Sequence, residues 1–196
     1  MSKIKAKWLR LTAETNALDF LERAGQFILK TEESPIFWKW VVLSLHSALY
    51  GFAICACKGT NPDNVVFRTK KGERKLIRFD DALKKCQDDN LMNMLYGSKA
   101  LVLSRNQVQS IELLKKQLRN NFEHYIPKGW SIELHGLPRM TIDVLNVIRF
   151  LAVETGTYIH LNTSQIRKVK SIVFKSKRFL KKSGLCKEAL LVETLS

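Results

Sequence analysis

Apolar residues recur at steps of three and four along most of the chain, which is the spacing of amphipathic helices. The clearest stretch covers 104–125, where one face would carry Val108, Ile111, Leu114, Leu118 and Phe122. Similar patterns predict further helices over 12–30, 34–57, 80–88, 141–154 and 164–183. The expected N-caps are Thr12, Ser34 and Thr141, with Pro35 in the first turn after Ser34. The pattern therefore predicts an all-α protein.

The segment 36–57 is apolar enough to require comparison with a membrane span. Its length approaches the roughly 20 residues that cross a bilayer. Lys39, Ser44 and His46 interrupt it, and a charge within a span is energetically costly. We interpret the segment as a buried core helix that pairs with the helix of 12–30 as an antiparallel hairpin, and His46 as a core residue. The N-terminal residues lack a leader-like pattern, so we expect a cytoplasmic protein without a membrane partner.

Between 58 and 79 the helical pattern stops. Turn signals at Asn61-Pro62 and Lys71-Gly72 accompany two short apolar runs, 65–67 and 76–79. We expect a small β-hairpin or a loop insertion, and its many lysines and arginines make it strongly basic. Such a segment either binds an anionic partner or is simply a solvated hairpin.

The overall charge says more about the function of the protein than about its fold. The chain has 196 residues, with 33 Lys or Arg against 18 Asp or Glu, and its formal net charge is +15. This excess points to a polyanionic partner, either nucleic acid or an anionic membrane surface. Residues 155–187 hold nine Lys or Arg and no acidic residue. We expect one helical domain over 1–160, including the basic segment 58–79, with a basic C-terminal helix and tail over 161–196 packed on it.

The sequence favours neither a metal site nor a cofactor. The four cysteines, at 55, 57, 86 and 186, form no C-x-x-C pair, and no Cys/His set has zinc spacing, so we expect a reduced chain without metal. His135 and His160 have no partners at metal-binding spacing. Phosphate-binding loops of the G-x-x-x-x-G-K-S/T and G-x-G-x-x-G types do not occur, so nucleotide-driven motors and Rossmann enzymes have no support.

The long helical pattern of 104–125 ends with a group suited to RNA cleavage, Arg119-Asn120 followed by His124. Cleavage through the ribose 2′-OH needs a proton acceptor, a proton donor and positive charge for the developing phosphorane. A histidine serves both proton steps near neutral pH, and an arginine holds phosphate oxygens with its planar fork. Asn120 precedes His124 by one helical turn, where its amide would orient the imidazole. On a regular helix Arg119 lies about 140° from His124, a separation that a second copy across a dimer interface would overcome.

This run, near the end of a long helix in an α-helical chain of this size, resembles the R-x4-6-H signature of the HEPN (higher eukaryotes and prokaryotes nucleotide-binding) superfamily. The resemblance covers roughly residues 10–160. It implies a helical bundle and a homodimer in which two motifs face one cleft. It further implies metal-independent endoribonuclease activity in a toxin or anti-phage defence setting, with an antitoxin or another protein as a further partner. It also implies that Arg119, Asn120 and His124 form the catalytic set.

In this hypothesis the basic segments hold the RNA backbone. The residues expected to bind RNA are Arg68, Lys70, Lys71, Arg74, Arg167, Lys168, Lys170, Lys175 and Arg178. Three alternatives stay open. The protein is a non-catalytic helical module that binds nucleic acid or nucleotides; the helix of 164–183 lies on a membrane surface; or the motif is an ordinary solvated face, with Arg119 paired to Glu123.

Overall fold

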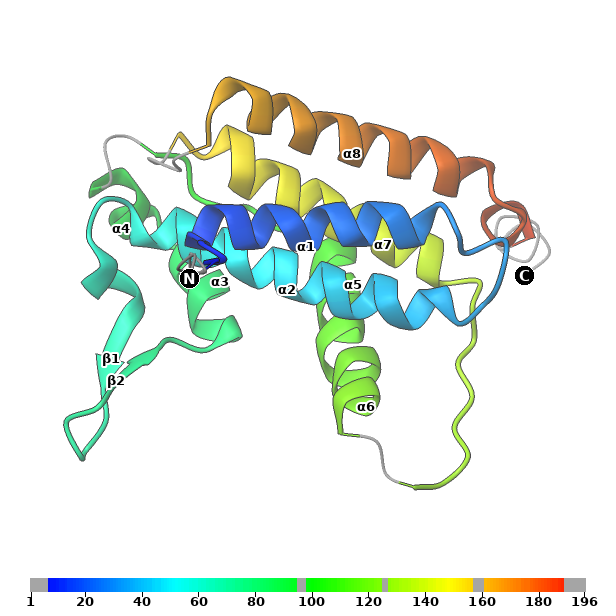
Figure 1. The fold of residues 1–196 in the computed structure, drawn as a ribbon, viewed down its shortest axis with the longest axis horizontal. Coiled ribbons are helices and arrows are strands. Elements are labelled where there is room, and N and C mark those ends of the chain that lie inside the picture. The colour runs from blue at the N-terminus through cyan, green and yellow to red at the C-terminus, as the bar shows by residue number, and fades with distance from the viewer. Residues whose placement is uncertain (1–6, 95–97, 125–126, 157–160, 189–196) are drawn as a thin grey trace, which may run out of the picture.

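The computed structural model describes residues 7–94, 98–124, 127–156 and 161–188, and it is mainly helical (Figure 1). Its elements in chain order are α1 (Ala13–Ile28), α2 (Phe37–Lys58), a 3-10 turn (Pro62–Val65), β1 (Val66–Arg68), β2 (Arg74–Leu76), α3 (Phe79–Cys86), α4 (Asp89–Met94), α5 (Arg105–Glu112), a π-helical segment (Leu113–Arg119), α6 (Asn120–Glu123), α7 (Leu137–Arg149), a second π-helical segment (Phe150–Glu154) and α8 (Thr163–Lys182). The predicted all-α character, with one small β-hairpin, is confirmed.

Helices α1 and α2 form the predicted antiparallel hairpin (Figure 1). Thr12 caps α1 as expected: its hydroxyl accepts a hydrogen bond from the Thr15 N–H at 3.1 Å, and Thr15 Oγ1 accepts one from the Thr12 N–H at 2.8 Å. At the other end of α1, Gly25 lies against Ile172 of α8. The start of α1 is therefore stabilised by its own cap, and its other end packs against α8.

Helix α2 is the centre of the core and contacts α1, α3, α7 and both π-helical segments. By length and composition it is apolar enough to cross a membrane, but 72% of its most apolar window is buried inside the protein. This burial fits the core helix of a soluble protein. The helix thus has neighbours on most of its circumference.

Two close contacts fix α1 against α2. A Cβ atom on Gly51 would lie 2.7 Å from the Ala17 Cβ, so the two helices approach closely only because Gly51 has no side chain. At the start of α1 the buried Glu14 accepts a hydrogen bond from Lys58 Nζ at 2.5 Å. Burial would raise the pKa of Glu14, but Lys58 and local hydrogen bonds hold it below its ordinary value.

Helix α8 lies across α1 and α7 (Figure 1). Its apolar face is buried through Val169, Val173 and Leu180, and its basic residues remain near the surface. The same face is the one that a surface helix would bury in a lipid headgroup region. In this fold that face packs on protein.

The predicted hairpin is present as β1 and β2, which pair antiparallel with Val66 opposite Leu76 and Arg68 opposite Arg74. Gly72 adopts a φ of 81° in the connecting turn, a conformation that glycine permits without strain. The hairpin projects away from the helices, on the same side of the molecule as α6 (Figure 1).

Two predicted N-caps are wrong. Helix α2 begins at Phe37, because residues 34–36 form a tight turn in which the Phe37 N–H donates to the Ser34 carbonyl oxygen at 3.2 Å. Helix α7 begins at Leu137, with Pro138 in its first turn, where proline is tolerated. Thr141 consequently lies within the helix on its buried face, at 0% exposure, instead of capping it.

The contact between Gly51 and Ala17 predicts the effect of adding one methyl group. Overpacking against a rigid neighbour destabilises a protein by about 1–3 kcal/mol. The higher helix propensity of alanine, compared with glycine, offsets up to about 1 kcal/mol of this loss. We expect Gly51→Ala to lower the free energy of unfolding in urea by about 1–2 kcal/mol. Adding Ala17→Gly should restore part of the loss, and a Gly51→Ala variant as stable as the wild type would contradict this packing.

Candidate functional site

The helix that carries the motif is not a regular α-helix throughout. Helix α5 passes into the π-helical segment Leu113–Arg119 and then into α6. At the second junction the Asn120 N–H donates to the carbonyl oxygen of Lys115, five residues earlier. Such widened turns shift the register of the side chains that follow and often occur at functional sites. Arg119 is the last residue of the widened segment.

Arg119 is held by its own helix on two sides. Its Nη1 donates to Asn120 Oδ1 at 3.0 Å, and its Nη2 lies 2.6 Å from Glu123 Oε2. The side chain is only 29% exposed. Its Nε is buried and has no hydrogen-bond partner among the residues that the structure describes. The ion pair to Glu123 is the one that the solvated-face alternative predicts, although the Arg119 side chain is only partly exposed.

His46 of α2 is buried in the core, as the sequence predicts, and the charge of Arg119 lowers its pKa, which the sequence does not predict. Its ring is 7% exposed and stacks on Phe79 of α3, with 4.6 Å between ring centroids. Burial, followed by the positive charges of Arg119 and Lys115, lowers the pKa of His46 to about 4, although Asp80 opposes the shift. His46 is therefore neutral at pH 7. Its proximity to Arg119 depends on the packing of α2 against the motif helix, which periodicity does not reveal.

An ion pair connects the motif helix to α3, the helix that follows the hairpin. Lys115 Nζ lies 2.6 Å from both carboxylate oxygens of Asp80. The lysine is largely covered, with 20% of its side chain exposed. The pair brings the base of the basic hairpin close to the helix that carries Arg119.

His124 occupies a position different from the expected one. It caps the C-terminus of α6 with a φ of −113° and a ψ of 54°, outside helical geometry, and its N–H donates to the Asn120 carbonyl oxygen at 2.8 Å. Its side chain is exposed. The expected hydrogen bond from the Asn120 amide to the imidazole is absent between these two described residues. The backbone leaves helical geometry at His124, and the Asn120 amide oxygen accepts its hydrogen bond from Arg119 instead.

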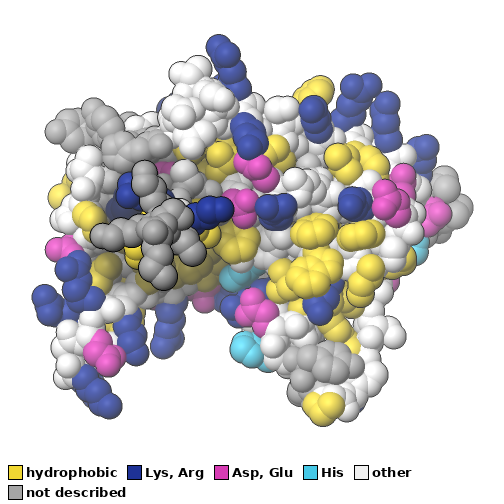
Figure 2. Space-filling view, viewed as in Figure 1, with side chains coloured by type: hydrophobic (Ala, Val, Ile, Leu, Met, Phe, Trp, Pro, Cys, Tyr) yellow, Lys and Arg dark blue, Asp and Glu magenta, His cyan; other side chains and the backbone are white. Residues whose placement is uncertain are grey.

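The basic residues predicted to bind RNA fall on separate surfaces, as Figure 2 shows for the hairpin and for α8. Arg68, Lys70, Lys71 and Arg74 are exposed on the hairpin, where Arg74 pairs with Asp63. On α8, Lys168 pairs with Glu22 of α1, and Lys175 also lies on the side facing α1. Lys170 and Arg178 line a groove between α7 and α8. Arg167 is exposed in the first turns of α8.

The groups that hold metals and cofactors in other proteins are sparse here. Within 7–94, 98–124, 127–156 and 161–188, no group of three His, Cys, Asp or Glu side chains could hold a metal ion. All four cysteines are free thiols, and the Sγ atoms of Cys57 and Cys86 lie 3.2 Å apart in the core. The hydrogen bond with the Cys57 thiol, followed by burial, raises the pKa of Cys86. His160 and Tyr125 lie outside the described residues.

No family model matches this chain, and searches of curated proteins and of solved structures found no significant match. The functional argument therefore depends on the residues and their geometry.

The buried His46 predicts a specific dependence of stability on pH. Its pKa is 6.5 when unfolded and about 4 when folded, so between these values the unfolded chain binds a proton that the folded chain does not. The free energy of unfolding should therefore fall as the pH is lowered from about 6.5 to about 4, by an amount on the order of 3 kcal/mol. His46→Phe should weaken this dependence in urea titrations across that range. Equal slopes for the variant and the wild type would show that His46 does not titrate in this way.

Proposed function

We propose that this protein is a cytoplasmic, HEPN-type endoribonuclease that cleaves RNA without a metal ion, in a toxin or anti-phage defence setting. The observation that carries the proposal is the state of Arg119. Its guanidinium is mostly covered, its Nε has no hydrogen-bond partner among the described residues, and His124 lies five residues further along, at the helix end. A partly covered arginine with spare donor capacity, at the same helix end as an exposed histidine, is suited to a phosphodiester.

The chemistry assigns one task to each residue. His124 removes the proton from the ribose 2′-OH, whose oxygen attacks phosphorus as the bond from phosphorus to the 5′-oxygen breaks. The proton that the leaving 5′-oxygen needs comes from an imidazolium, supplied by His124 of a second copy. Arg119 holds the phosphate oxygens as negative charge develops on them. The products carry a 2′,3′-cyclic phosphate and a 5′-hydroxyl, and DNA is not cut because it has no 2′-OH.

Phosphate binding requires a local exchange at Arg119. In the free protein Glu123 occupies one side of the guanidinium at 2.6 Å. A phosphate that approaches the same fork replaces this carboxylate, because bidentate contacts between arginine and phosphate are strong. Asn120 remains bonded to Nη1 and keeps the guanidinium plane in position. In this mechanism Asn120 therefore positions the guanidinium of Arg119 rather than the imidazole of His124.

The position of the hairpin supports an RNA substrate. The hairpin that carries the exposed Arg68, Lys70 and Lys71 projects on the same side of the molecule as α6, so a strand bound to the hairpin would lie on the side that carries the motif (Figure 1). Contacts between cations and phosphates provide most of the affinity of such a surface and make it sensitive to salt.

A homodimer is part of the proposal, and an apolar patch supports it. This patch consists of Phe27, Leu29, Ile36, Phe37 and Trp40, at the end of the hairpin formed by α1 and α2. Ile36 is 60% exposed and Trp40 44% exposed, and Phe27 contacts both Phe37 and Trp40 with centroid distances of 6.1 Å. Leu43, one turn before His46, is only partly buried and continues this face toward the site. Figure 2 shows hydrophobic side chains gathered over α1 and α2 on this face.

A second candidate function is favoured by the pairing of Arg119 with Glu123. If the carboxylate stays in place, the motif binds no phosphate, and the protein is a nucleic-acid-binding module whose basic surfaces act without catalysis. An antitoxin or another protein partner is compatible with either function.

RNA cleavage in EDTA distinguishes the two functions. Wild-type protein should cut single-stranded RNA and leave 2′,3′-cyclic ends. His124→Ala and Arg119→Gln should each lower the rate by about 100-fold or more, because each removes a general acid–base or a charge-stabilising group. The matched controls are His135→Ala and Arg105→Gln, which change exposed residues outside the motif. Cleavage that His124→Ala leaves unchanged would exclude the enzyme that we propose.

The apolar patch predicts the oligomeric state. Trp40→Glu should shift sedimentation toward the monomer and reduce cleavage in parallel, since the two proton steps come from different copies. Val102→Glu is the control, because Val102 is 86% exposed outside the patch. Dimers that persist in Trp40→Glu would place the interface elsewhere.

A further inference from the structure

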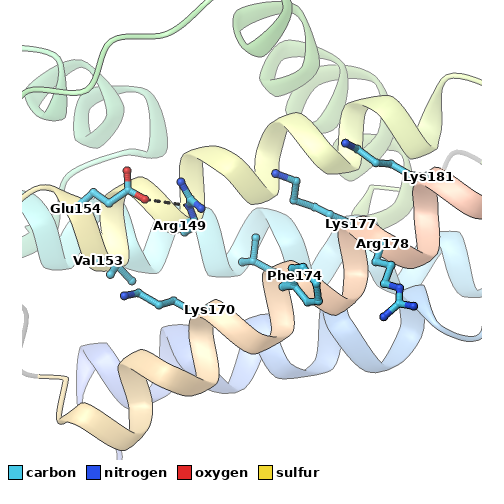
Figure 3. A pocket seen from close by; sticks show the side chains of 9 residues that line it. Arg149, Val153, Glu154, Lys170, Phe174, Lys177, Arg178 and Lys181 are labelled. Carbon is cyan, nitrogen blue, oxygen red and sulfur yellow. Dashed lines mark ion pairs between the residues drawn. The ribbon is translucent and has the colours of Figure 1, made fainter.

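A groove of about 800 Å³ lies between α7 and α8 (Figure 3). It is lined by five basic side chains and one carboxylate, together with apolar groups: Arg149, Lys170, Lys177, Arg178, Lys181, Glu154, Val153, Val173 and Phe174. The groove is remote from the motif, because α8 and α6 lie on opposite sides of the pair formed by α1 and α2 (Figure 1). It therefore requires its own explanation.

The cations of this groove form a row. Lys170, Lys177 and Lys181 follow one another along one face of α8, since their spacings of seven and four residues are whole helical turns. From Lys170 to Lys181 the helix rises about 16 Å. A row of this length is longer than one phosphate group and can contact several phosphates of a nucleic-acid backbone.

The positive charge in the groove is only partly compensated. Arg149 Nε pairs with Glu154 Oε1 at 2.9 Å, and Lys177 Nζ donates to the neutral Asn146 Oδ1 at 2.6 Å. Burial lowers the pKa of Lys177, and the charges of Arg149 and Lys181 lower it further. An anionic occupant would relieve this mutual repulsion.

Phe174 indicates what kind of polyanion fits. Its ring is 65% exposed in the middle of the row, between Lys170 and Arg178 (Figure 3). An aromatic ring among cations is the arrangement that binds unpaired bases, which stack on the ring while their phosphates contact the basic side chains. In a duplex the bases are already stacked on each other and do not need such a ring. The combination therefore favours a single strand.

We propose that the groove between α7 and α8 is a binding site for single-stranded nucleic acid, with phosphates on Lys170, Lys177 and Lys181 and a base on Phe174. The site holds its strand through the backbone and one base face, so it accepts RNA and DNA. It goes beyond the proposed cleavage reaction and does not require it.

The test measures binding of strands that the proposed chemistry cannot cleave. The probes are a fluorescein-labelled 2′-O-methyl oligouridylate and an oligothymidylate of the same length, titrated with full-length protein at several salt concentrations. The groove variant is Lys170→Gln with Lys181→Gln. Its matched control is Lys182→Gln with Lys187→Gln, which removes the same charge from exposed positions at and just beyond the end of the same helix, outside the groove.

The two interactions give separate readouts. Loss of two phosphate contacts should lower the slope of log Kd against log salt by about 1.4, since each contact to a single strand contributes about 0.7. The control pair should leave the slope unchanged. Phe174→Ala should weaken binding about 5- to 150-fold without changing the slope, because a stacked base carries no charge.

Several outcomes would contradict the proposal that this groove binds single-stranded nucleic acid. They are equal slopes for the groove and control variants, no effect of Phe174→Ala, or a duplex that binds as tightly as the single strand. Groove-dependent binding to phosphatidylserine vesicles without binding of either oligonucleotide would assign the groove to a membrane surface. Cleavage is not measured here, so failure of the nuclease proposal leaves this result interpretable.

Discussion

The burial of α2 is the constraint on which the other features of the structure depend. This helix contacts α1, α3, α7 and both π-helical segments, and Gly51 allows α1 to approach it without a side chain between them. The same packing buries His46 and keeps its imidazole neutral, with the charge of Arg119 lowering the pKa further. The motif and the core are thus coupled, because a residue whose pKa Arg119 lowers belongs to the most buried helix.

Positive charge accumulates outside this core, on two separate surfaces. Several acidic residues connect elements: Asp80 holds the motif helix through Lys115, Glu22 holds α8 through Lys168, and Glu14 holds the end of α2 through Lys58. Few carboxylates remain to neutralise the hairpin or the α7–α8 groove. Both surfaces therefore retain the electrostatic field that attracts a polyanion, and in our account one presents RNA to the motif while the other holds a single strand.

The sequence predicts the helices better than it predicts the site. The apolar periodicity of 12–30 and 164–183 and the cap at Thr12 are local signals, and each corresponds to a helix or a cap in the structure. Thr141 was misassigned as a cap because the apolar stripe of α7 begins earlier, at Leu137, and the adjacent proline obscures the start of the helix. The π-helical segment before Asn120 leaves no trace in the periodicity. The expected hydrogen bond between the Asn120 amide and His124 is wrong, because the amide oxygen bonds to Arg119 and the backbone leaves helical geometry at His124. Tertiary packing alone brings three residues to their sites: His46, Arg149 and Lys177. The sequence by itself does not reveal this packing.

The central claim is that His124 activates the ribose 2′-hydroxyl of RNA while Arg119 holds the phosphate that this hydroxyl attacks. The most direct measurement uses an RNA whose preferred cleavage position is known and a matched strand with a single 2′-deoxy nucleotide on the 5′ side of that bond. Our account predicts that cleavage disappears at the substituted position and continues at unsubstituted ones. Cleavage of the substituted bond at an unchanged rate would contradict the account, because the attacking oxygen would then come from water.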